Sequence, residues 1–378
     1  MRERIDIVVP EAALAANHTK AERLRKTHAF EPTDRTPVVA DIQQMTALGA
    51  RACRFGRYVR SPRDNLREQI LNHKWRIENV RDDQPIPTER LTIVPDLGCL
   101  RGVEFAMDIR WSDDQPPKCV HPLTAPEQID QLQVPHPESG LNARRIQWYK
   151  AMRELAGDFD VRLNGRPLEI DVTLTHGGGP VPSAFALAGV NLMLWTALEP
   201  RRVHRLMRIV TDSHLNCIRY IDELVGRHGD HAVWMGADSA EMLSPEAFRE
   251  FAVPYYLEIW SKHPRPRTFH MCGKIDHLLS ILRDEMDIDH LAGFGFPTDR
   301  HLLAEQLAGR AVLTGGPHPM LIKDGPGQRI VDECVDYIRT VGRRGGYILS
   351  GGCGSVPGTP VEHYELMVEA SRRAGPQL

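Results

Sequence analysis

Three residues with side chains that bind soft metals stand at two places in the chain. His270 and Cys272 are two positions apart, and Cys353 follows a pair of glycines much later. If residues 267 to 272 form a strand, His270 and Cys272 project from the same face and can hold one ion. An imidazole and two thiolates suit zinc, and three protein ligands leave a fourth position for water or a substrate, as in catalytic sites. The alternative is that both cysteines are small core residues beside a hydrogen-bonded His270.

Two carboxylates are the predicted catalytic residues. Asp238 follows the apolar run 232–235 and precedes Glu241, so both could face a cavity as an acid, a base or a metal-supporting group. Helix capping is the alternative for Asp238, although Ser244 already provides an N-cap before the proline at position 245.

Four further residues are predicted to bind substrate. Asp41 ends an early apolar run, His176 opens a glycine-rich segment, and His318 lies in a second one. The glycines beside His176 are equally suited to close backbone approach. Tyr255 belongs to a helical pattern, where packing is the alternative. The segment around His318 and the loop after Cys353 could hold an anion, but neither is a nucleotide-binding GxGxxG or P-loop motif.

Six arginines recur almost every third residue, at positions 51, 54, 57, 60, 63 and 67. Such a run is typical of a solvated helix face. It could also form a lid that holds an anion, or a docking surface for a protein partner.

The chain alternates apolar, β-rich runs with helical patterns. The predicted strands cover residues 37–42, 91–95, 167–174, 231–237, 267–272, 287–293, 311–315 and 346–351, and most are followed by a predicted helix. Eight strands that alternate with helices favour a closed (β/α)8 TIM barrel over an open doubly wound sheet. In such a barrel the residues at the carboxyl ends of the strands meet at one mouth, which would bring the candidate residues together.

Two segments stand outside this alternation. Residues 1–36 form a predicted N-terminal helical extension, with a helix over 11–30, and residues 37–378 form the barrel. The stretch 81–140 is rich in proline and aspartate and is predicted to be a capping insertion between helices at 61–80 and 142–157.

Composition excludes several classes of protein. The 378 residues are 42% hydrophobic and 26% charged, with a formal net charge of −3, so nothing favours a nucleic-acid or membrane-surface role. The odd number of cysteines, seven, does not suggest a disulfide framework. The apolar run near the N-terminus is too short for a signal peptide, so we expect a cytoplasmic protein.

Several motifs together resemble the uroporphyrinogen decarboxylase superfamily, and within it the zinc- and corrinoid-dependent methyltransferases. The resemblance spans residues 30–375 and rests on Asp34-Arg35-Thr36-Pro37-Val38, Gly236-Ala237-Asp238, Ser244-Pro245-Glu246-Ala247-Phe248-Arg249-Glu250-Phe251, Pro254-Tyr255, Phe269-His270-Met271-Cys272-Gly273 and Gly351-Gly352-Cys353. It implies a (β/α)8 barrel with zinc held by His270, Cys272 and Cys353. The arginine-rich segment of the decarboxylases is replaced by Asp41-Ile42-Gln43-Gln44-Met45. The family's usual carboxylate pair is broken, because Ala237 precedes Asp238.

The resemblance implies methyl transfer between a small substrate, which is a methyl ether, a methylamine or a thiol, and the cobalt of a corrinoid. The corrinoid (cobalamin) would be carried by a partner protein, because the chain lacks an Asp-x-His-x-x-Gly motif. A homodimer is expected from the resemblance alone. The alternatives are a metal-free decarboxylase that uses Asp238 and the arginines of segment 51–67, and a non-catalytic protein that binds a corrinoid or another tetrapyrrole.

Overall fold

The computed structural model describes residues 2–98 and 101–378. Its strands are β1 (Glu3–Ile7), β2 (Arg90–Ile93), β3 (Ile109–Arg110), β4 (Lys118–Cys119), β5 (Phe159–Leu163), β6 (Arg166–Pro167), β7 (Glu169–Val172), β8 (Trp234–Gly236), β9 (Thr268–His270), β10 (His290–Phe294), β11 (Val312–Gly315) and β12 (Tyr347–Leu349). The α-helices are α1 (Glu11–Ala15), α2 (Asn17–His28), α3 (Gln44–Ala50), α4 (Phe55–Tyr58), α5 (Pro62–Asn79), α6 (Gly140–Leu155), α7 (Pro180–Ala188), α8 (Asn191–Leu198), α9 (Pro200–Val225), α10 (Pro245–Phe251), α11 (Val253–Trp260), α12 (Leu279–Asp284), α13 (Arg300–Leu307), α14 (Pro319–Asp324), α15 (Gly327–Val341) and α16 (Val361–Ala374). Short 3-10 turns add η1 (Pro126–Gln131), η2 (Ala156–Asp158), η3 (Ala240–Met242), η4 (Asp276–Leu278) and η5 (Gly342–Arg344).

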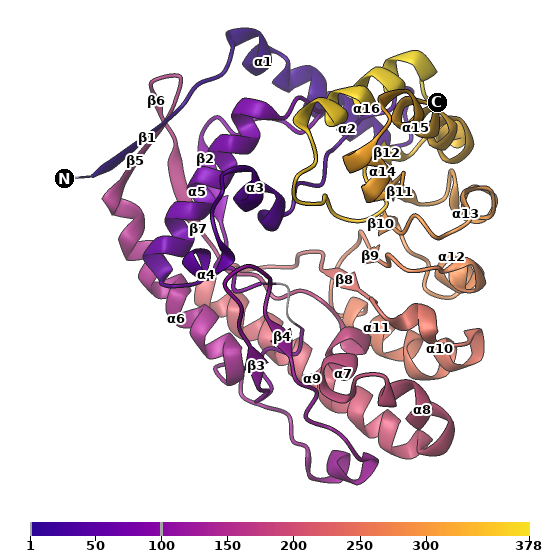
Figure 1. Ribbon diagram of the computed structural model, residues 1–378. Helices are drawn as coiled ribbons and strands as arrows, with labels where there is room; N and C mark the ends of the chain where they lie inside the picture. The colour runs from indigo at the N-terminus through magenta and orange to yellow at the C-terminus, as the bar shows by residue number, and fades with distance from the viewer. Residues whose placement is uncertain (1, 99–100) are drawn as a thin grey trace.

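The fold is mixed α/β, with parallel strands covered by helices. Figure 1 shows the strands β8 to β12 lining the middle of the molecule, with the helices α10 to α16 outside them. These five strands are hydrogen-bonded in the order β12-β11-β10-β9-β8, and every pair is parallel. The predicted alternation of strand and helix is therefore confirmed in this half of the chain.

The central strands form because their apolar side chains are fully covered. Phe269, Leu291, Leu313 and Leu349 have at most 1% of their surface exposed. Burying each such side chain stabilises the fold by roughly 1.5–3 kcal/mol. Helices such as α15 and α16 cover the strands with apolar residues at helical spacing and leave charged residues in solvent.

Hydrogen bonds extend the parallel arrangement beyond the five-stranded sheet. Val38 pairs with Leu349 beside β12, and the Gly236 amide donates to the Gly178 carbonyl at 2.6 Å beside β8. β2 and β7 form a separate parallel pair. The predicted strand 37–42 is thus represented only by the single bridge of Val38. Among residues 2–98 and 101–378, the hydrogen-bonded sheets do not join into one closed barrel.

The amino-terminal segment contains the strand β1, which the sequence analysis does not predict. β1 pairs in parallel with β5, and β5 turns back into the short strand β6. The helices expected over 11–30 are present as α1 and α2. β1 was missed because its partner lies far along the chain, and a single strand of five residues gives little local signal.

Two helical predictions also need correction. The helical pattern that follows Ser244, over residues 245–262, forms two helices, α10 and α11, because Pro254 in the first turn of α11 cannot donate a hydrogen bond to the preceding turn. The long helix α9 was not predicted, although its buried residues recur at helical spacing, as in Val203, Leu206, Met207 and Val210.

The predicted insertion has little regular structure. Its described residues contain β2, the antiparallel pair β3 and β4, and η1. The Leu123 amide donates to the Leu187 carbonyl at 3.0 Å, which ties the insertion to α7.

No single helix among the described residues is long and apolar enough to cross a membrane. α7 and α8 meet that length and composition only as a pair, and the pair is bent by 101°.

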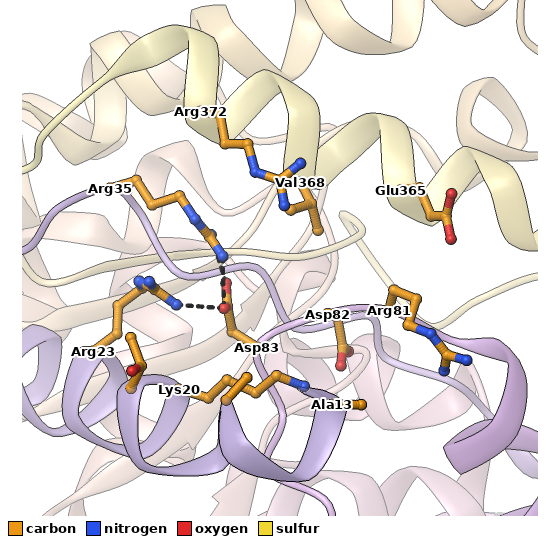
Figure 2. Close-up of a pocket in the computed structure, with 12 residues that line it drawn as sticks. Ala13, Lys20, Arg23, Arg35, Arg81, Asp82, Asp83, Glu365, Val368 and Arg372 are labelled. Atoms are coloured by element: carbon orange, nitrogen blue, oxygen red, sulfur yellow. Dashed lines mark hydrogen bonds and ion pairs between the residues drawn. The ribbon is translucent and has the colours of Figure 1, made fainter. Parts of the chain in front are cut away.

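The amino ends of the strands are closed by a buried ion-pair network, drawn in Figure 2. The Asp83 carboxylate accepts hydrogen bonds from Arg23 at 2.6 Å, from Arg35 at 2.6 and 2.7 Å, and from the Val38 amide at 2.8 Å. A cavity of about 530 Å³ lies beside it, lined by residues of α2, α16 and the segment before β2.

Candidate metal centre

Three ligand-type side chains meet where β8 and β9 end. The strands pair in parallel with Gly236 opposite His270, so Asp238 and Cys272, each two residues farther on, reach the same level beyond the strands. The Asp238 Oδ1 atom lies 3.2 Å from His270 Nε2 and 3.5 Å from Cys272 Sγ. One ligand atom from each of the three residues lies within 4.8 Å of the others.

The backbone determines the tautomer of His270. Its Nδ1 atom lies 2.6 Å from the carbonyl oxygen of Ala292, which can only accept, so Nδ1 carries a proton. Nε2 then faces the Asp238 carboxylate, which is also an acceptor when ionised. Two acceptors at 3.2 Å need a cation between them, either a proton or a metal ion.

The pKa shifts agree with this geometry. Burial alone would lower the pKa of His270, but the hydrogen bond and negative charge of Asp238 raise it overall. Burial would raise the pKa of Asp238, yet the hydrogen bond and charge of His270 lower it overall. The pair therefore holds positive charge between its two atoms.

Cys353, on the loop after β12, interacts with Cys272, but it is not one of the three residues whose ligand atoms lie within 4.8 Å of one another. The Gly352 amide donates to the Pro317 carbonyl at 2.8 Å, and the Gly352 carbonyl accepts from the Phe296 amide at 3.0 Å, so the loop is held between its neighbours. A hydrogen bond with Cys272 lowers the pKa of Cys353 to about 6, with help from the Gly354 backbone and the charge of His270. The same interaction raises the pKa of Cys272. The opposite shifts of the two pKa values favour Cys353 over Cys272 as the thiolate of the pair.

Close backbone packing fixes the His270 ring. Gly293 has a φ of +84°, and a side chain there would place its Cβ 2.7 Å from His270 Nδ1. On the other side the Trp234 ring lies 5.8 Å from the imidazole, centroid to centroid. The imidazole therefore has little freedom to turn away from Asp238.

A cavity of about 760 Å³ opens beside the centre. Its lining includes Trp234, His176, Gln43, Arg101 and Arg145. Because Trp234 contacts both the cavity and His270, a molecule in the cavity would lie next to the metal-ligand group.

Two of the other predicted site residues lie close to the centre. Asp41 shares a small cleft with Cys353, and its carbonyl accepts from the Ser355 amide at 2.9 Å. The Glu241 side chain packs over Gly273, the residue after Cys272, so closely that Gly273 has no room for a Cβ atom.

The remaining three predicted residues have different surroundings. His176 lines the cavity, but its ring lies 4.5 Å from that of His214 rather than beside His270. The Tyr255 hydroxyl is bound to His204, at 2.9 Å from Nδ1, between α11 and α9, so the structure favours packing over substrate binding. His318 caps α14 by accepting from the Met320 amide at 3.0 Å, and its ring packs on Phe296.

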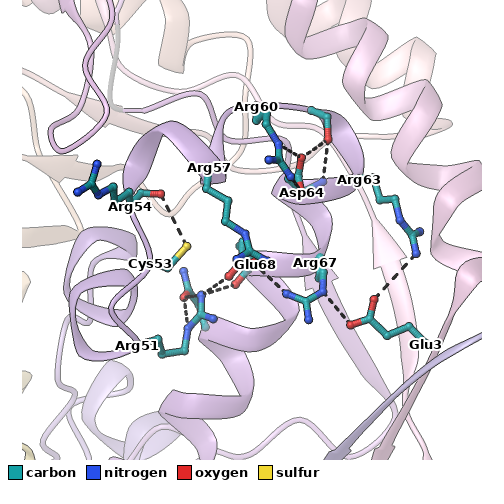
Figure 3. A network of polar contacts seen from close by, with 12 residues as sticks. Glu3, Arg51, Cys53, Arg54, Arg57, Arg60, Arg63, Asp64, Arg67 and Glu68 are labelled. Atoms are coloured by element: carbon teal, nitrogen blue, oxygen red, sulfur yellow. Dashed lines mark hydrogen bonds and ion pairs between the residues drawn. The ribbon is translucent and has the colours of Figure 1, made fainter.

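The arginine run 51–67 is paired with carboxylates, as Figure 3 shows. The buried Glu68 carboxylate lies 2.9 Å from Arg51, 3.2 Å from Arg57 and 3.0 Å from Arg67. Further carboxylates pair with Arg54, Arg60 and Arg63. These charges are therefore neutralised within the chain and are not collected around a substrate anion.

Sequence reasoning missed three residues that shape the cavity. Trp234 is 38% exposed although it stands in an apolar strand, and an aromatic residue at a strand end was the available signal. Arg101 and Arg145 come from the insertion and from α6, and their approach to the cavity depends on the fold.

Comparison with known proteins assigns the family. The family described as Uroporphyrinogen decarboxylase (URO-D) matches residues 19–374. The chain belongs to the uroporphyrinogen decarboxylase family.

The relatives of this family member include proteins named as decarboxylases and one named as a methyltransferase. It is 25% identical over 372 residues to a uroporphyrinogen decarboxylase of Xanthomonas campestris, covering 93% of this chain and 98% of that protein. It is 26% identical over 278 residues to a uroporphyrinogen decarboxylase of Anaeromyxobacter sp., covering 71% and 74%. It is also 26% identical over 198 residues to a methylated-thiol–coenzyme M methyltransferase of Methanosarcina mazei, covering 51% of each.

The fold has a solved counterpart in a methyltransferase from Methanosarcina mazei. The two structures superpose with a TM-score of 0.64 over 94% of this chain and 98% of the other, at 20% sequence identity. At that identity the likeness supports the fold of this family member, and its chemistry has to be argued from the site.

Proposed function

We propose that this chain is a zinc-dependent methyltransferase that moves a methyl group between a small substrate and the cobalt of a corrinoid carried by a partner protein. The substrate would be a methyl ether, a methylamine or a thiol. The observation that carries the proposal is the meeting of Asp238, His270 and Cys272, with the thiol of Cys353 interacting with Cys272.

The donor set fits zinc. His270, Cys272 and Cys353 offer one imidazole nitrogen and two sulfurs, the ligands of catalytic zinc sites with three protein ligands. The Ala292 carbonyl holds the far ring nitrogen of His270, as the outer partners of metal-bound histidines do. Asp238 could take the fourth position until a substrate displaces it. Bound zinc would supply Lewis acidity, which lowers the pKa of a thiol or polarises a methylated heteroatom.

The protein groups around the centre position the reactants. Trp234 lines the cavity and its ring lies 5.8 Å from that of His270, so movement of this one side chain would bring a small substrate in the cavity to the ligand group. Asp238 can accept a proton from an entering thiol, since its carboxylate already faces Nε2 of His270. Glu241, which packs on the backbone after Cys272, would keep that loop in place.

We further propose that the strands form the eight-stranded (β/α)8 barrel that the alternation of elements predicts, with 81–140 as a cap. The parallel order β12 to β8 and its extensions through Val38 and Gly178 support this arrangement. Gly98 and Val103 of the insertion line the cavity, as expected of a cap over the mouth.

Zinc content and methyl transfer test the proposal together. We would compare wild type with Cys353→Ala, and use Cys53→Ala as a control because Cys53 is a partly exposed thiol outside the centre. Wild type and the control should demethylate or methylate one of a panel of thiols, ethers and amines with free cobalamin, followed by cobalt absorbance. Cys353→Ala should hold one zinc fewer per chain and lose this activity. Full zinc retention by Cys353→Ala would contradict the site.

A metal-free decarboxylase is the second candidate. Arg101 and Arg145 line the cavity and could bind the carboxylates of a substrate. Against it, the arginines of 51–67 are already paired with carboxylates. Decarboxylation that survives complete zinc removal would favour this candidate. Zinc binding without methyl transfer from any corrinoid would favour a non-catalytic binding protein.

A further inference from the structure

A second group of metal-ligand side chains lies apart from the candidate metal centre and shares no residue with it. Glu104 comes from the insertion, His176 from the turn after β7, and Cys217 from α9. One ligand atom of each lies within 4.8 Å of the others. Ligand atoms about 2.0–2.3 Å from a zinc ion stand less than 5 Å apart, so these separations suit one shared ion.

Glu104 and Cys217 are buried and His176 is half-buried, and several polar atoms of the group have no partner among residues 2–98 and 101–378. Glu104 is 1% exposed, and Cys217 is fully buried. Ser213 donates to Oε1 of Glu104 at 2.7 Å, but Oε2 of the same carboxylate has no hydrogen-bond partner among the described residues. Nδ1 of His176 is likewise buried and has no partner in that part of the chain.

A second histidine adds to this shortage of partners. His214 is 2% exposed, its Nε2 atom has no partner within the described ranges of the chain, and its ring lies 4.5 Å from that of His176. Buried polar atoms almost always have a protein or ligand partner, so three orphaned atoms in one place indicate that a bound group completes the site.

The local fold explains why these residues meet. Ser213, His214 and Cys217 lie on the buried face of one helix, where positions four apart are neighbours. The α9 helix packs against α7, which follows His176 in the chain. The site therefore joins the insertion, the cavity wall and α9.

Arg145 lies near this group, but its positive charge is shared with other residues and does not take the place of a bound metal ion. Arg145 interacts electrostatically with Glu104 and Cys217, but it also interacts with Asp96. Its guanidinium donates to Asn142 Oδ1 and to the Thr175 carbonyl, both at 3.0 Å. An ionised carboxylate and thiolate would still need a further positive charge.

We propose that Glu104, His176 and Cys217 bind a second divalent metal ion of the zinc type, with His214 beside it as a further ligand or ring contact. With His214 as the fourth ligand the ion would be enclosed by protein side chains, as in structural zinc sites. Its ion would hold the insertion and the cavity wall against α9.

Cobalt substitution separates the two sites. In the double variant Cys272→Ala/Cys353→Ala, Cys217 is the thiolate left in either ligand group. Co²⁺ added to this variant should give the near-ultraviolet band of a thiolate–cobalt bond, with one ion bound per chain. Adding Cys217→Ser should remove the band and the ion. Adding Cys334→Ser instead should leave both, because Cys334 is an equally buried cysteine on α15 outside the group.

A second variant, which keeps all three proposed ligands, tests the site in case Cys217→Ser prevents folding. Ser213→Ala in the double variant removes the outer partner of Glu104 and should weaken Co²⁺ and Zn²⁺ binding by about 10–100-fold. Zinc added to the double variant should also raise its melting temperature. Absence of any bound metal in the folded double variant would overturn the proposal, as would a band that survives Cys217→Ser. Neither result depends on whether the chain transfers methyl groups.

Discussion

The two ends of the parallel strands differ in how their charged side chains are satisfied. At the amino ends the Asp83 carboxylate accepts from two arginines and a backbone amide, and it is 1% exposed (Figure 2). At the carboxyl ends Asp238 faces an imidazole nitrogen and a thiol, beside a second thiol of low pKa. The first group is complete within the protein, and the second faces two acceptors, Asp238 and His270 Nε2, toward a position that a proton or a metal ion can take.

This difference gives a physical way to separate structural from functional charges. The Asp83 side chain is 2% exposed and that of Asp238 is 37% exposed, and both groups lie beside a cavity, so the size of a cavity does not distinguish them. A network whose donors match its acceptors holds the fold together. A group with several acceptors and too few donors is prepared for an ion or a substrate.

The largest predicted effect is a loss of stability when Asp83, at the amino ends of the strands, is replaced. Asp83→Ala leaves the side chains of Arg23 and Arg35 without their buried partner, and they are only 8% and 13% exposed. Breaking a buried pair in this way should lower the free energy of unfolding by about 3–5 kcal/mol, measured by urea unfolding. Zinc bound per folded chain should not change.

Asp34→Ala is the matched control for that variant. Asp34 also pairs with Arg23, at 2.7 Å, but it is 63% exposed. Its loss should cost at most about 1 kcal/mol because solvent screens the pair. Equal costs for the two variants would remove the distinction between a buried, complete network and a surface pair.

The next effect is a pH dependence near the amino end of β10. Burial lowers the pKa of His290 to about 4, with a smaller contribution from His28. An unfolded histidine takes up its proton near pH 6.5, so between these values the unfolded state binds more protons and stability falls as pH falls. This one group should contribute a loss of about 1–3 kcal/mol between pH 7 and pH 4, and no change above pH 7.

His290→Asn tests this dependence because an amide can still bind the Thr314 hydroxyl, 2.8 Å from Nε2 in the native protein. Urea midpoints of wild type and variant should converge as the pH is lowered from 7 to 4. Parallel curves would show that His290 does not control the acid response.

A smaller effect is expected at the carboxyl ends from Gly293→Ala. The left-handed backbone of Gly293 should make an alanine cost about 1–2 kcal/mol. Its Cβ would also press on His270 Nδ1, so zinc should bind more weakly. Gly226→Ala is the control, because Gly226 has a φ of +70° and open space around it. That variant should show a similar loss of stability and normal zinc binding.

Much of this arrangement could be predicted from the sequence, because local patterns specify it. The spacing of His270 and Cys272 predicts a shared site, and these two residues lie together with Asp238, while Cys353 interacts with Cys272. The helix beginning at Pro245 was visible from its Ser244 cap, which accepts from the Ala247 amide at 3.1 Å.

Other features depend on contacts between distant segments and left no local pattern. β1 is a strand because β5 lies beside it, and its residues alone did not indicate this. Glu104 and Cys217 are separated by more than a hundred positions, so their meeting with His176 could not be read from spacing. Tyr255 and His318 stood in promising motifs, but nearby histidine and amide groups engage them.

The smallest predicted effect concerns the paired arginines of Figure 3 and decides between the two enzymatic proposals. Arg57 is 52% exposed and is one of three arginines on Glu68, so Arg57→Ala should cost at most about 1 kcal/mol. Arg51 is 16% exposed and also binds Asn72 Oδ1, so Arg51→Ala should cost more. If these charges serve only the fold, Arg57→Ala should leave kcat and KM for the methylated substrate unchanged. A clear rise in KM with little change in the urea midpoint would place the segment against the substrate and favour the decarboxylase.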